Sequence, residues 1–232
     1  MPLSADVQFT QGAGAPAASQ DICVVGGGFS GCMVAANLLT RSAGHRVPLR
    51  VHLIERRPDM GQGAAYATRD PLHLLNVPAR NMSAWADSPD DFLEWARARK
   101  PEARPSNFLP RRLYAEYLLD TLARVEASAQ GRCALHRVHD EAICAMQRPD
   151  GSWEVHLASG RTIPCEAIVL ATGHRAPGDP LGGRWKGPTD HWIADPWRPG
   201  ATDPISANEA VVIVGSGLTA MDQMLSLAAR QP

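Results

Sequence analysis

Two glycine-rich turns are the part of this chain best suited to chemistry, because each directly follows a short apolar run. The first turn, at residues 26–31, has the spacing Gly-x-Gly-x-x-Gly, and the second, at residues 215–220, has Gly-x-Gly-x-x-Ala. The small residues of such a turn permit a tight exit from a strand, leave room for a pyrophosphate and let helix and strand pack closely. The following helix offers free N–H groups to the phosphates. Two such turns predict two dinucleotides, and paired dinucleotides point to hydride transfer from a nicotinamide to a flavin.

The first turn lies within a complete βαβ pattern. A strand is expected at 21–25, a helix at about 29–42 that stops at Gly44, and a second strand at 50–54. Glu55 closes the second strand, where a carboxylate can accept hydrogen bonds from ribose hydroxyls. The alternative is a purely structural strand–helix turn, which this sequence context disfavours.

Arg56 and Arg57 follow Glu55 and leave two interpretations open. An arginine at this place can bind a 2′-phosphate, which would favour NADP at the first turn. The alternative, which we favour, is a pair of solvated surface arginines, because the second turn has the features of the nicotinamide site. The residue that would separate NADH from NADPH at the second turn lies beyond position 232, so the sequence leaves that choice open.

The middle of the chain is expected to supply ligand contacts and two helices. Residues 57–82 are rich in Gly, Pro, Asn and Asp, and a long irregular stretch in a compact domain is often used for ligand contact. Helices are expected at 89–99 and 110–128. Arg111 and Arg112 open the second of these helices, and at least one of them is expected to be solvated.

The period of the apolar residues then changes to two. Strands are expected at 134–139, 142–147 and 153–157, in a small antiparallel β-meander that covers about 133–165. A buried strand at 167–170 follows the meander. This second group of strands therefore differs in kind from the βαβ pattern at the start of the chain.

Composition and charge argue against several classes of protein. The net charge of -1 and the pI of about 6.7 give no basic field for nucleic acid or anionic membranes, and no apolar stretch is long enough to span a bilayer. Five cysteines without a Cys-x-x-Cys pair argue against a disulfide framework, a zinc ribbon and a redox dithiol. The N-terminus lacks the cationic start and apolar core of a signal peptide, so a cytoplasmic protein is expected. No metal site is expected.

The glycine turns and one later segment resemble the flavoproteins with two dinucleotide-binding domains, in which an NAD(P) domain is inserted into an FAD domain. The resemblance rests on the turn at 26–31 with Glu55, on Leu-Ala-Thr-Gly at 170–173 after a meander, and on the turn at 215–220. It implies FAD at the first turn and NAD(P)H at the second. It also implies that the Ala-Thr-Gly segment marks where the chain leaves the FAD domain and approaches the flavin.

A narrower resemblance lies in five short segments between the first turn and the meander. Their sequences, at 61–66, 73–79, 82–85, 91–95 and 110–114, are similar to those of a group of bacterial FAD/NAD(P)-binding proteins. That group is similar in layout to the N-hydroxylating flavin monooxygenases. The resemblance implies an α/β fold: a Rossmann-like FAD-binding domain with a small antiparallel β-meander, then the first βα unit of a second, NAD(P)-binding Rossmann domain.

The same resemblance places residues 73–82 near the isoalloxazine ring and gives single residues candidate roles. Asn76 can hydrogen-bond to the flavin edge, and Arg80 either stabilises negative charge there or forms a surface salt bridge. His73 is a weaker candidate, while His174 could donate a hydrogen bond near the flavin or nicotinamide. The weak catalytic candidates are therefore Asn76, Arg80 and His174. The predicted cofactor-binding residues are Gly26, Gly28, Phe29, Ser30, Gly31, Glu55, Arg56, Asn76, Val138, Ala171, Thr172, Gly173, Gly215, Gly217 and Ala220.

The expected organisation has four parts: a disordered N-terminus at 1–20, an FAD-binding domain at 21–175, a connector at 176–208 and the start of an NAD(P)-binding domain at 209–232. Relatives complete the FAD domain with a return strand and a late Gly-Asp segment, and this sequence ends before either. A C-terminally truncated chain is therefore expected, and the sequence leaves open whether it binds FAD or turns over by itself.

Three hypotheses for function stay open. The leading one is an FAD-dependent oxidoreductase that uses NAD(P)H and transfers oxygen to a small molecule, as a monooxygenase does. The second is a flavin reductase or dehydrogenase without oxygen transfer, although the missing cysteine pair argues against a disulfide reductase. The third is a dinucleotide-binding module without catalysis. The sequence indicates neither the substrate nor the oligomeric state, and no nucleic acid or membrane partner is expected.

Overall fold

The computed structural model of the protein describes residues 19–42, 47–129, 131, 133–174, 178–198 and 200–230. The predictions for residues 1–18 and for Gly44 lie outside the described residues. Within these ranges, none of the helices combines the length and the hydrophobicity needed to span a bilayer.

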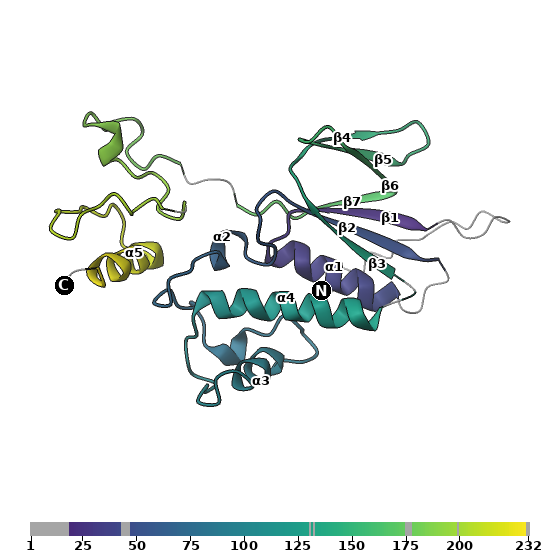
Figure 1. Cartoon of the computed structure of the whole chain (residues 1–232), viewed down its shortest axis with the longest axis horizontal. Helices are drawn as coiled ribbons and strands as arrows, with labels where there is room; N and C mark the ends of the chain where they lie inside the picture. The colour runs from purple at the N-terminus through teal and green to yellow at the C-terminus, as the bar shows by residue number, and fades with distance from the viewer. Residues whose placement is uncertain are drawn as a thin grey trace, which may run out of the picture.

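A parallel four-stranded sheet with the order β3-β2-β1-β7 is the centre of the fold (Figure 1). The strand β1 (Gln20–Val25) pairs with β2 (Leu49–Glu55) on one side and with β7 (Ala167–Leu170) on the other. The strand β3 (Cys133–His139) pairs with the far side of β2. The parallel sheet with its crossover helices confirms the predicted α/β class.

The helices α1 (Phe29–Ser42) and α4 (Arg111–Ser128) pack side by side on one face of the sheet (Figure 1). The short helix α3 (Asp91–Arg97) packs against α4. Parallel strands cannot be joined by a tight turn, so each helical segment returns the chain to the start of the next strand. Both predicted long helices are confirmed, and the helix expected at 89–99 is shorter than predicted.

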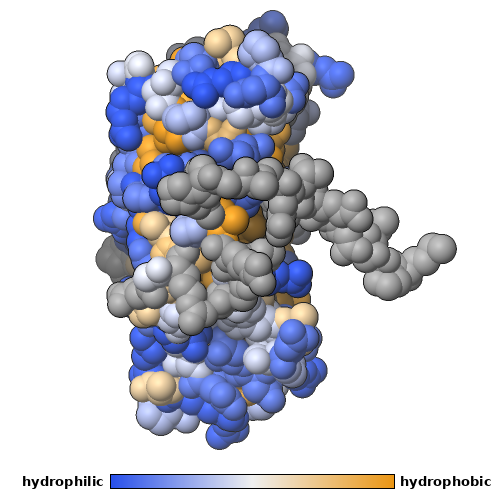
Figure 2. Space-filling model, turned by 90° about the vertical axis from the view of Figure 1, so that its right-hand side faces the viewer, coloured by the Kyte–Doolittle hydropathy of each residue, from blue (hydrophilic) through white to orange (hydrophobic). Residues whose placement is uncertain are grey.

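A small antiparallel sheet covers the opposite face of the parallel sheet. It consists of β4 (Ala142–Gln147), β5 (Trp153–Leu157) and β6 (Thr162–Cys165). Because successive strand residues point to opposite faces, Val24 packs among the helices and Cys23 packs against the meander. Seen from the right-hand side of Figure 1, hydrophobic residues show in the middle of the molecule, with hydrophilic residues above and below (Figure 2).

The prediction that the meander starts near residue 133 was wrong. The strand β3 pairs in parallel with β2, with Val138 opposite Ile54, and the meander consists of the three later strands. The physical reason is the preceding helix α4, which carries the chain back across the sheet before β3 begins. A period of two identifies a strand without identifying the strand it pairs with.

The stretch at 57–82 is largely irregular, as expected, apart from α2 (Gly63–Tyr66) and the 3-10 turn η1 (Ala79–Asn81). After β7 the described chain contains only the 3-10 turn η2 (Thr189–His191) before its last helix. The loop and the last part of the chain therefore depend on side-chain and main-chain contacts for their position.

The second glycine unit differs from its prediction. Its helix is present as α5 (Leu218–Ala228), but residues 210–214 form no strand and pair with no strand of the described chain. The side chain of Val212 is exposed, at 88% of its full area. A parallel strand gains its hydrogen bonds from its neighbours, and none of the strands in the described residues lies beside this segment.

Candidate dinucleotide-binding site

The first glycine turn is closed on two sides by main-chain atoms. Gly26 has a φ of 107°, and a Cβ built on it would lie 2.2 Å from the carbonyl oxygen of Ala171. A Cβ on Gly31 would lie 1.7 Å from the carbonyl oxygen of Gly26. Neither position accepts a side chain without movement of the backbone, so these two glycines are required by the packing around the turn.

A second glycine-rich loop faces the first turn. The N–H group of Gly61 donates to the carbonyl of Gly27 at 2.7 Å, and a Cβ on Gly28 would lie 3.3 Å from the Cα of Gly63. Gly61 and Gly63 both have positive φ, at 80° and 54°. The sequence predicted ligand contacts for the stretch at 57–82 as a whole, but it did not single out Gly61 or Gly63. The signal for this second loop was its pair of glycines.

The start of α1 offers free main-chain N–H groups to an anion. No acidic residue lies in its first turn, and Phe29 and Ser30 are exposed to solvent. The first N–H groups of a helix have no partner within the helix, and the helix dipole places positive charge there. Without a carboxylate to occupy these groups, the end of the helix can bind a phosphate.

Glu55 reaches the turn from the end of β2. One carboxylate oxygen accepts the N–H of Gly27 at 2.8 Å, and the other accepts the N–H of Arg57 at 2.9 Å. Only 9% of Glu55 is exposed, so these bonds fix the carboxylate beside the turn. Each oxygen keeps a further lone pair with which it can accept a hydroxyl of a ribose. The residues of the first turn and Glu55 therefore fit an adenosine diphosphate group.

Arg56 points away from the turn. Its guanidinium forms an ion pair with Glu141 at 3.0 Å, and the two side chains are 65% and 49% exposed. Arg57 is exposed as well. This placement favours the solvated interpretation of both arginines.

The Ala-Thr-Gly segment continues β7 past the first turn. The N–H of Ala171 donates to the carbonyl of Val25 at 2.8 Å, which holds the segment beside the end of β1. Thr172, Gly173 and His174 are exposed. These three residues are therefore accessible to a ligand at the carboxyl end of the sheet, which is the usual binding edge of such folds.

Val138 lies in β3, and it is too buried for its side chain to contact a ligand. Its side chain is 7% exposed and packs in the apolar cluster between the parallel sheet and the meander. Contact between Val138 and a dinucleotide would therefore have to use its main chain.

Asn76 and Arg80 are both exposed on the loop before α3. Main-chain hydrogen bonds to residues 105–109 hold this loop, including Leu75 to Leu109 at 2.8 Å and Arg80 to Pro105 at 3.1 Å. Their side chains are thus free to meet a ligand from a fixed backbone.

His73 is buried and Arg111 is half-buried, although neither residue was a leading candidate from the sequence. His73 is 4% exposed and its Nε2 lies 2.8 Å from the hydroxyl of Ser226, while Arg111 is ion-paired with Asp222 at 2.7 Å. Both contacts cross from the first unit to α5. No local pattern in the sequence signals them, because the partners are more than 100 residues apart.

The second glycine turn has an open environment. Gly215 has a φ of 125°, and Gly217 is the residue before α5. A Cβ on either glycine would have no atom within 4 Å. Ala220 lies in the first turn of α5 and is half-buried. The turn shares the positive φ of its first glycine with the first turn, and it lacks the packing that surrounds the first turn.

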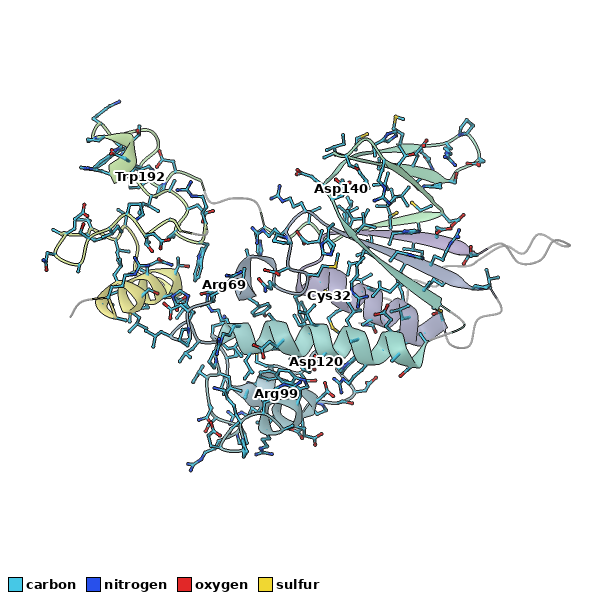
Figure 3. The ribbon with its side chains drawn as sticks, in the orientation of Figure 1. Cys32, Arg69, Arg99, Asp120, Asp140 and Trp192 are labelled. Atoms are coloured by element: carbon cyan, nitrogen blue, oxygen red, sulfur yellow. The ribbon has the colours of Figure 1, made fainter. Side chains whose placement is uncertain are left out.

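Cys32 packs beneath the first turn, at the end of α1 nearest to it (Figure 3). Its thiol lies 3.3 Å from the carbonyl oxygen of Gly27, and burial raises its pKa to about 11. The thiol is therefore protonated at neutral pH and serves in packing beneath the turn. Among the described residues, no group of His, Cys, Asp and Glu is arranged to hold a metal ion.

Two hollows lie away from the first turn. One of about 440 Å³ lies between α1 and α4 and is lined by Thr40, Trp85 and Arg124 among others. The other, of about 390 Å³, lies between α5 and the segment before the second turn. No predicted site residue lines either hollow. The candidate site is therefore assigned from the glycine turns and their neighbours, and these hollows are not part of it.

The fold and the first turn define an α/β dinucleotide-binding protein. A family model described as FAD-NAD(P)-binding matches residues 23–175, so the chain belongs to that family. FAD and NAD(P) are therefore its cofactors, which confirms the predicted pair. The matched residues include the first turn, Glu55 and the Ala-Thr-Gly segment, and they end before the second turn.

Similar solved structures include several monooxygenases. Cyclohexanone monooxygenase bound to epsilon-caprolactone is 20% identical over 67% of this chain and 27% of its own, with a TM-score of 0.47. Oxidized steroid monooxygenase bound to NADP is 20% identical over 70% of this chain and 28% of its own, with a TM-score of 0.46. S-allyl-L-cysteine S-oxygenase from Allium sativum is 17% identical over 70% and 39%, with a TM-score of 0.45. No curated protein matches this chain by sequence.

The chain thus matches 27% to 39% of the length of these structures. The predictions of a bacterial source and of a cytoplasmic location stay predictions.

Proposed function

We propose that this chain is the FAD-binding part of an oxidoreductase that uses NAD(P)H and transfers oxygen to a small molecule. The observation that supports the proposal is the presence of two glycine turns in one chain, of which only the first has a packed site around it. At the first turn, the packed glycines, the start of α1 and the carboxylate of Glu55 lie together. The second turn leads directly into α5. A flavin and a nicotinamide carried by one chain serve electron transfer between them.

The residues of the chain would bind and orient the cofactor, and the bound flavin would supply the redox chemistry and the reaction with oxygen. The turn at 26–31 and the start of α1 would bind the pyrophosphate, and Glu55 the ribose. Asn76 and Arg80, on their exposed loop, would contact the flavin edge and its negative charge. His174 would donate a hydrogen bond from the end of the Ala-Thr-Gly segment.

A first experiment tests FAD binding by the chain. The purified protein is mixed with FAD, and the visible spectrum and the quenching of flavin fluorescence give the Kd. Gly28→Val places a branched side chain between the two glycine loops, so we expect FAD affinity to fall at least about tenfold, which corresponds to about 1.4 kcal/mol. Gly178→Val is the matched control, because a Cβ on Gly178 meets no atom within 4 Å.

A second experiment separates oxygen transfer from plain flavin reduction. NAD(P)H oxidation is followed under ¹⁸O₂, and candidate small-molecule acceptors are analysed for the label. Label in a product supports the monooxygenase proposal. NAD(P)H oxidation without label in any product supports a reductase or dehydrogenase instead. A colourless protein that takes up no FAD contradicts both.

The alternative of a binding module without catalysis is favoured by one observation. The segment before the second turn forms no strand, and Val212 and Val214 are exposed. A dinucleotide bound only at the first turn, with no spectral response to NAD(P)H, would support this alternative.

A further inference from the structure

The last helix of the described chain buries a polar face. Asp222 and Ser226 are four residues apart on α5 and so lie on the same side of the helix. Asp222 is 6% exposed, whereas the apolar side chains of Met221 and Leu225 are 47% and 44% exposed. A helix that packs into its own hydrophobic core shows the opposite arrangement, so this polar face has a specific partner.

The first partner is Arg111, at the start of α4. Its Nη2 donates to Asp222 at 2.7 Å, and its Nε donates to the carbonyl of Leu74 at 2.8 Å. The two charged side chains are only 14% and 9% exposed. One guanidinium therefore connects the start of α4, the loop and α5, and the charge-assisted bonds hold these three elements together.

The second partner is His73, on the same loop. Ser226 donates its hydroxyl hydrogen to Asp70, so its oxygen can accept a hydrogen bond from the Nε2 of His73, 2.8 Å away. The Nδ1 of His73 forms a hydrogen bond with the hydroxyl of Thr68 at 2.6 Å. Each polar group of this chain of bonds has a partner, which gives the contact a defined orientation.

An aromatic side chain covers these contacts. The ring of Trp197 lies edge-on to His73, with 5.3 Å between ring centroids, and the Arg111 guanidinium carbon lies 5.2 Å from the ring centroid of Trp197. Arg69, next to Asp70, lies between α2 and α5 in Figure 3. The contact thus includes the connector as well as both glycine units.

We propose that Asp70, His73 and Arg111, with Asp222 and Ser226, form a polar joint that positions the second glycine turn relative to the loop that carries Asn76. The proposal rests on the proposed function, because the joint would set the geometry for hydride transfer from nicotinamide to flavin. The helix α5 begins within the second turn, and its fifth and ninth residues, Asp222 and Ser226, make the contacts with Arg111 and His73. The joint residues are positioning residues, since they act through the elements that they hold.

The test uses hydrogen exchange on the whole chain. Arg111→Gln and Asp222→Asn each break the buried pair, so the amides of α5 should exchange at least about tenfold faster, and the double variant should add little to either. Arg112→Gln is the matched control, because Arg112 is the exposed neighbour on the same helix. Unchanged exchange of α5 in both single variants would overturn the joint.

A conservative pair separates positioning from simple loss of stability. Ser226→Thr keeps the hydroxyl that His73 and Asp70 use, and should preserve the slow exchange, whereas Ser226→Ala should lose it. The emission of Trp197, obtained by difference from Trp197→Phe, should shift to longer wavelength in Arg111→Gln as water enters. Equal exchange in the threonine and alanine variants would contradict the role of the hydroxyl.

The functional measurement is anaerobic reduction of bound FAD. NAD(P)H should reduce the flavin at least about tenfold more slowly in Arg111→Gln than in Arg112→Gln, while dithionite reduces both at one rate, because only the first reaction needs the second turn. Equal NAD(P)H rates would overturn the positioning role. Absence of FAD binding or of NAD(P)H reduction in the unsubstituted chain would contradict the proposed function, and hydrogen exchange would still decide the joint.

Discussion

The two glycine turns share a spacing and a following helix, and they differ in the packing around them. Cβ atoms on Gly26 and Gly31 would collide with main-chain oxygens at 2.2 Å and 1.7 Å, whereas Cβ atoms on Gly215 and Gly217 would meet nothing within 4 Å. Both turns have positive φ at their first glycine. The spacing therefore specifies the backbone of the turn, and the neighbouring strands and loops make it a binding site.

The strands before the turns show the same contrast. The strand β1 has paired neighbours on both sides, and its residues alternate between two apolar cores. Residues 210–214 have the same apolar character, yet they have no paired neighbour in the described chain, and Val212 is exposed. A run of β-branched residues becomes a strand only when other strands lie beside it.

The largest expected effect comes from substituting the first glycine of each turn. Gly26→Ala and Gly215→Ala share the strain of positive φ, and only Gly26→Ala adds a contact with the carbonyl oxygen of Ala171. We expect Gly26→Ala to lower the free energy of unfolding by about 3 kcal/mol, and Gly215→Ala by about 1 kcal/mol. Urea denaturation followed by circular dichroism measures both.

Equal losses in the two variants would show that the turns are packed alike, which would remove the contrast between them. Gly178→Ala is the control, because Gly178 has neither positive φ nor a close neighbour. Its unfolding midpoint should equal that of the unsubstituted chain.

The next effect sharpens the role of Glu55 in the first turn. Glu55→Ala leaves the N–H groups of Gly27 and Arg57 without acceptors in a site that is 9% exposed, so stability should fall by about 1–3 kcal/mol. FAD affinity should fall as well, since the ribose loses its acceptor. Denaturation and flavin titration measure the two effects.

Glu55→Gln keeps one acceptor oxygen and should give an intermediate loss in both measurements. Glu141→Ala is the control, because Glu141 is exposed and pairs only with the side chain of Arg56 across the surface. If Glu141→Ala weakened FAD binding as much as Glu55→Ala, the assignment of the ribose to Glu55 would be wrong.

The first glycine unit could be predicted because its information is local. The strand, turn, helix and acidic residue follow one another within 21–55, and the structure has each of them in place. The meander boundary could not be predicted in the same way, since β3 and β4 have the same period and differ in their partners. Strand pairing is decided by the helix that precedes β3 and not by β3 itself.

The contacts of His73 and Arg111 could not be predicted for a different reason. Their partners lie on α5, more than 100 residues away, and the polar residues of α5 are ordinary in a surface helix. His73 also lies 3.1 Å from the carbonyl oxygen of Asp222, a main-chain contact with α5. Nothing in the sequence indicated that the partners of His73 would lie on α5.

A smaller effect is the different response to acid expected of Asp21, in the parallel sheet, and Asp70, in the joint with α5. Burial opposes ionisation of Asp21 in β1, but hydrogen bonds from Arg50 and His52 outweigh it and hold the pKa below the ordinary value of 3.8. At Asp70, burial again opposes ionisation, while bonds from Ser226 and the Leu72 N–H lower the pKa. A carboxyl with a lowered native pKa stabilises the fold above its unfolded pKa, and that contribution disappears as pH falls through the native value.

Both contributions should therefore be lost below about pH 3.8, at about 1 kcal/mol each. Asp21→Asn should reduce the acid dependence of global unfolding, whereas Asp70→Asn should reduce only the acid dependence of α5 exchange. Denaturation and hydrogen exchange between about pH 2 and about pH 5 measure the two. A response of global unfolding to Asp70→Asn would mean that the joint belongs to the main core.

The smallest expected effect is also the one that could reverse the roles of the two turns. Arg56→Ala removes an exposed ion pair with Glu141, so stability should change by less than about 0.5 kcal/mol and FAD affinity should stay the same. Titration of the variant with FAD and with NADP measures both affinities, and Arg57→Ala is the matched control. A selective loss of NADP affinity in Arg56→Ala would show that the first turn binds a 2′-phosphate. FAD would then belong to the second turn, and the packing around the first turn would have been built for the nicotinamide cofactor.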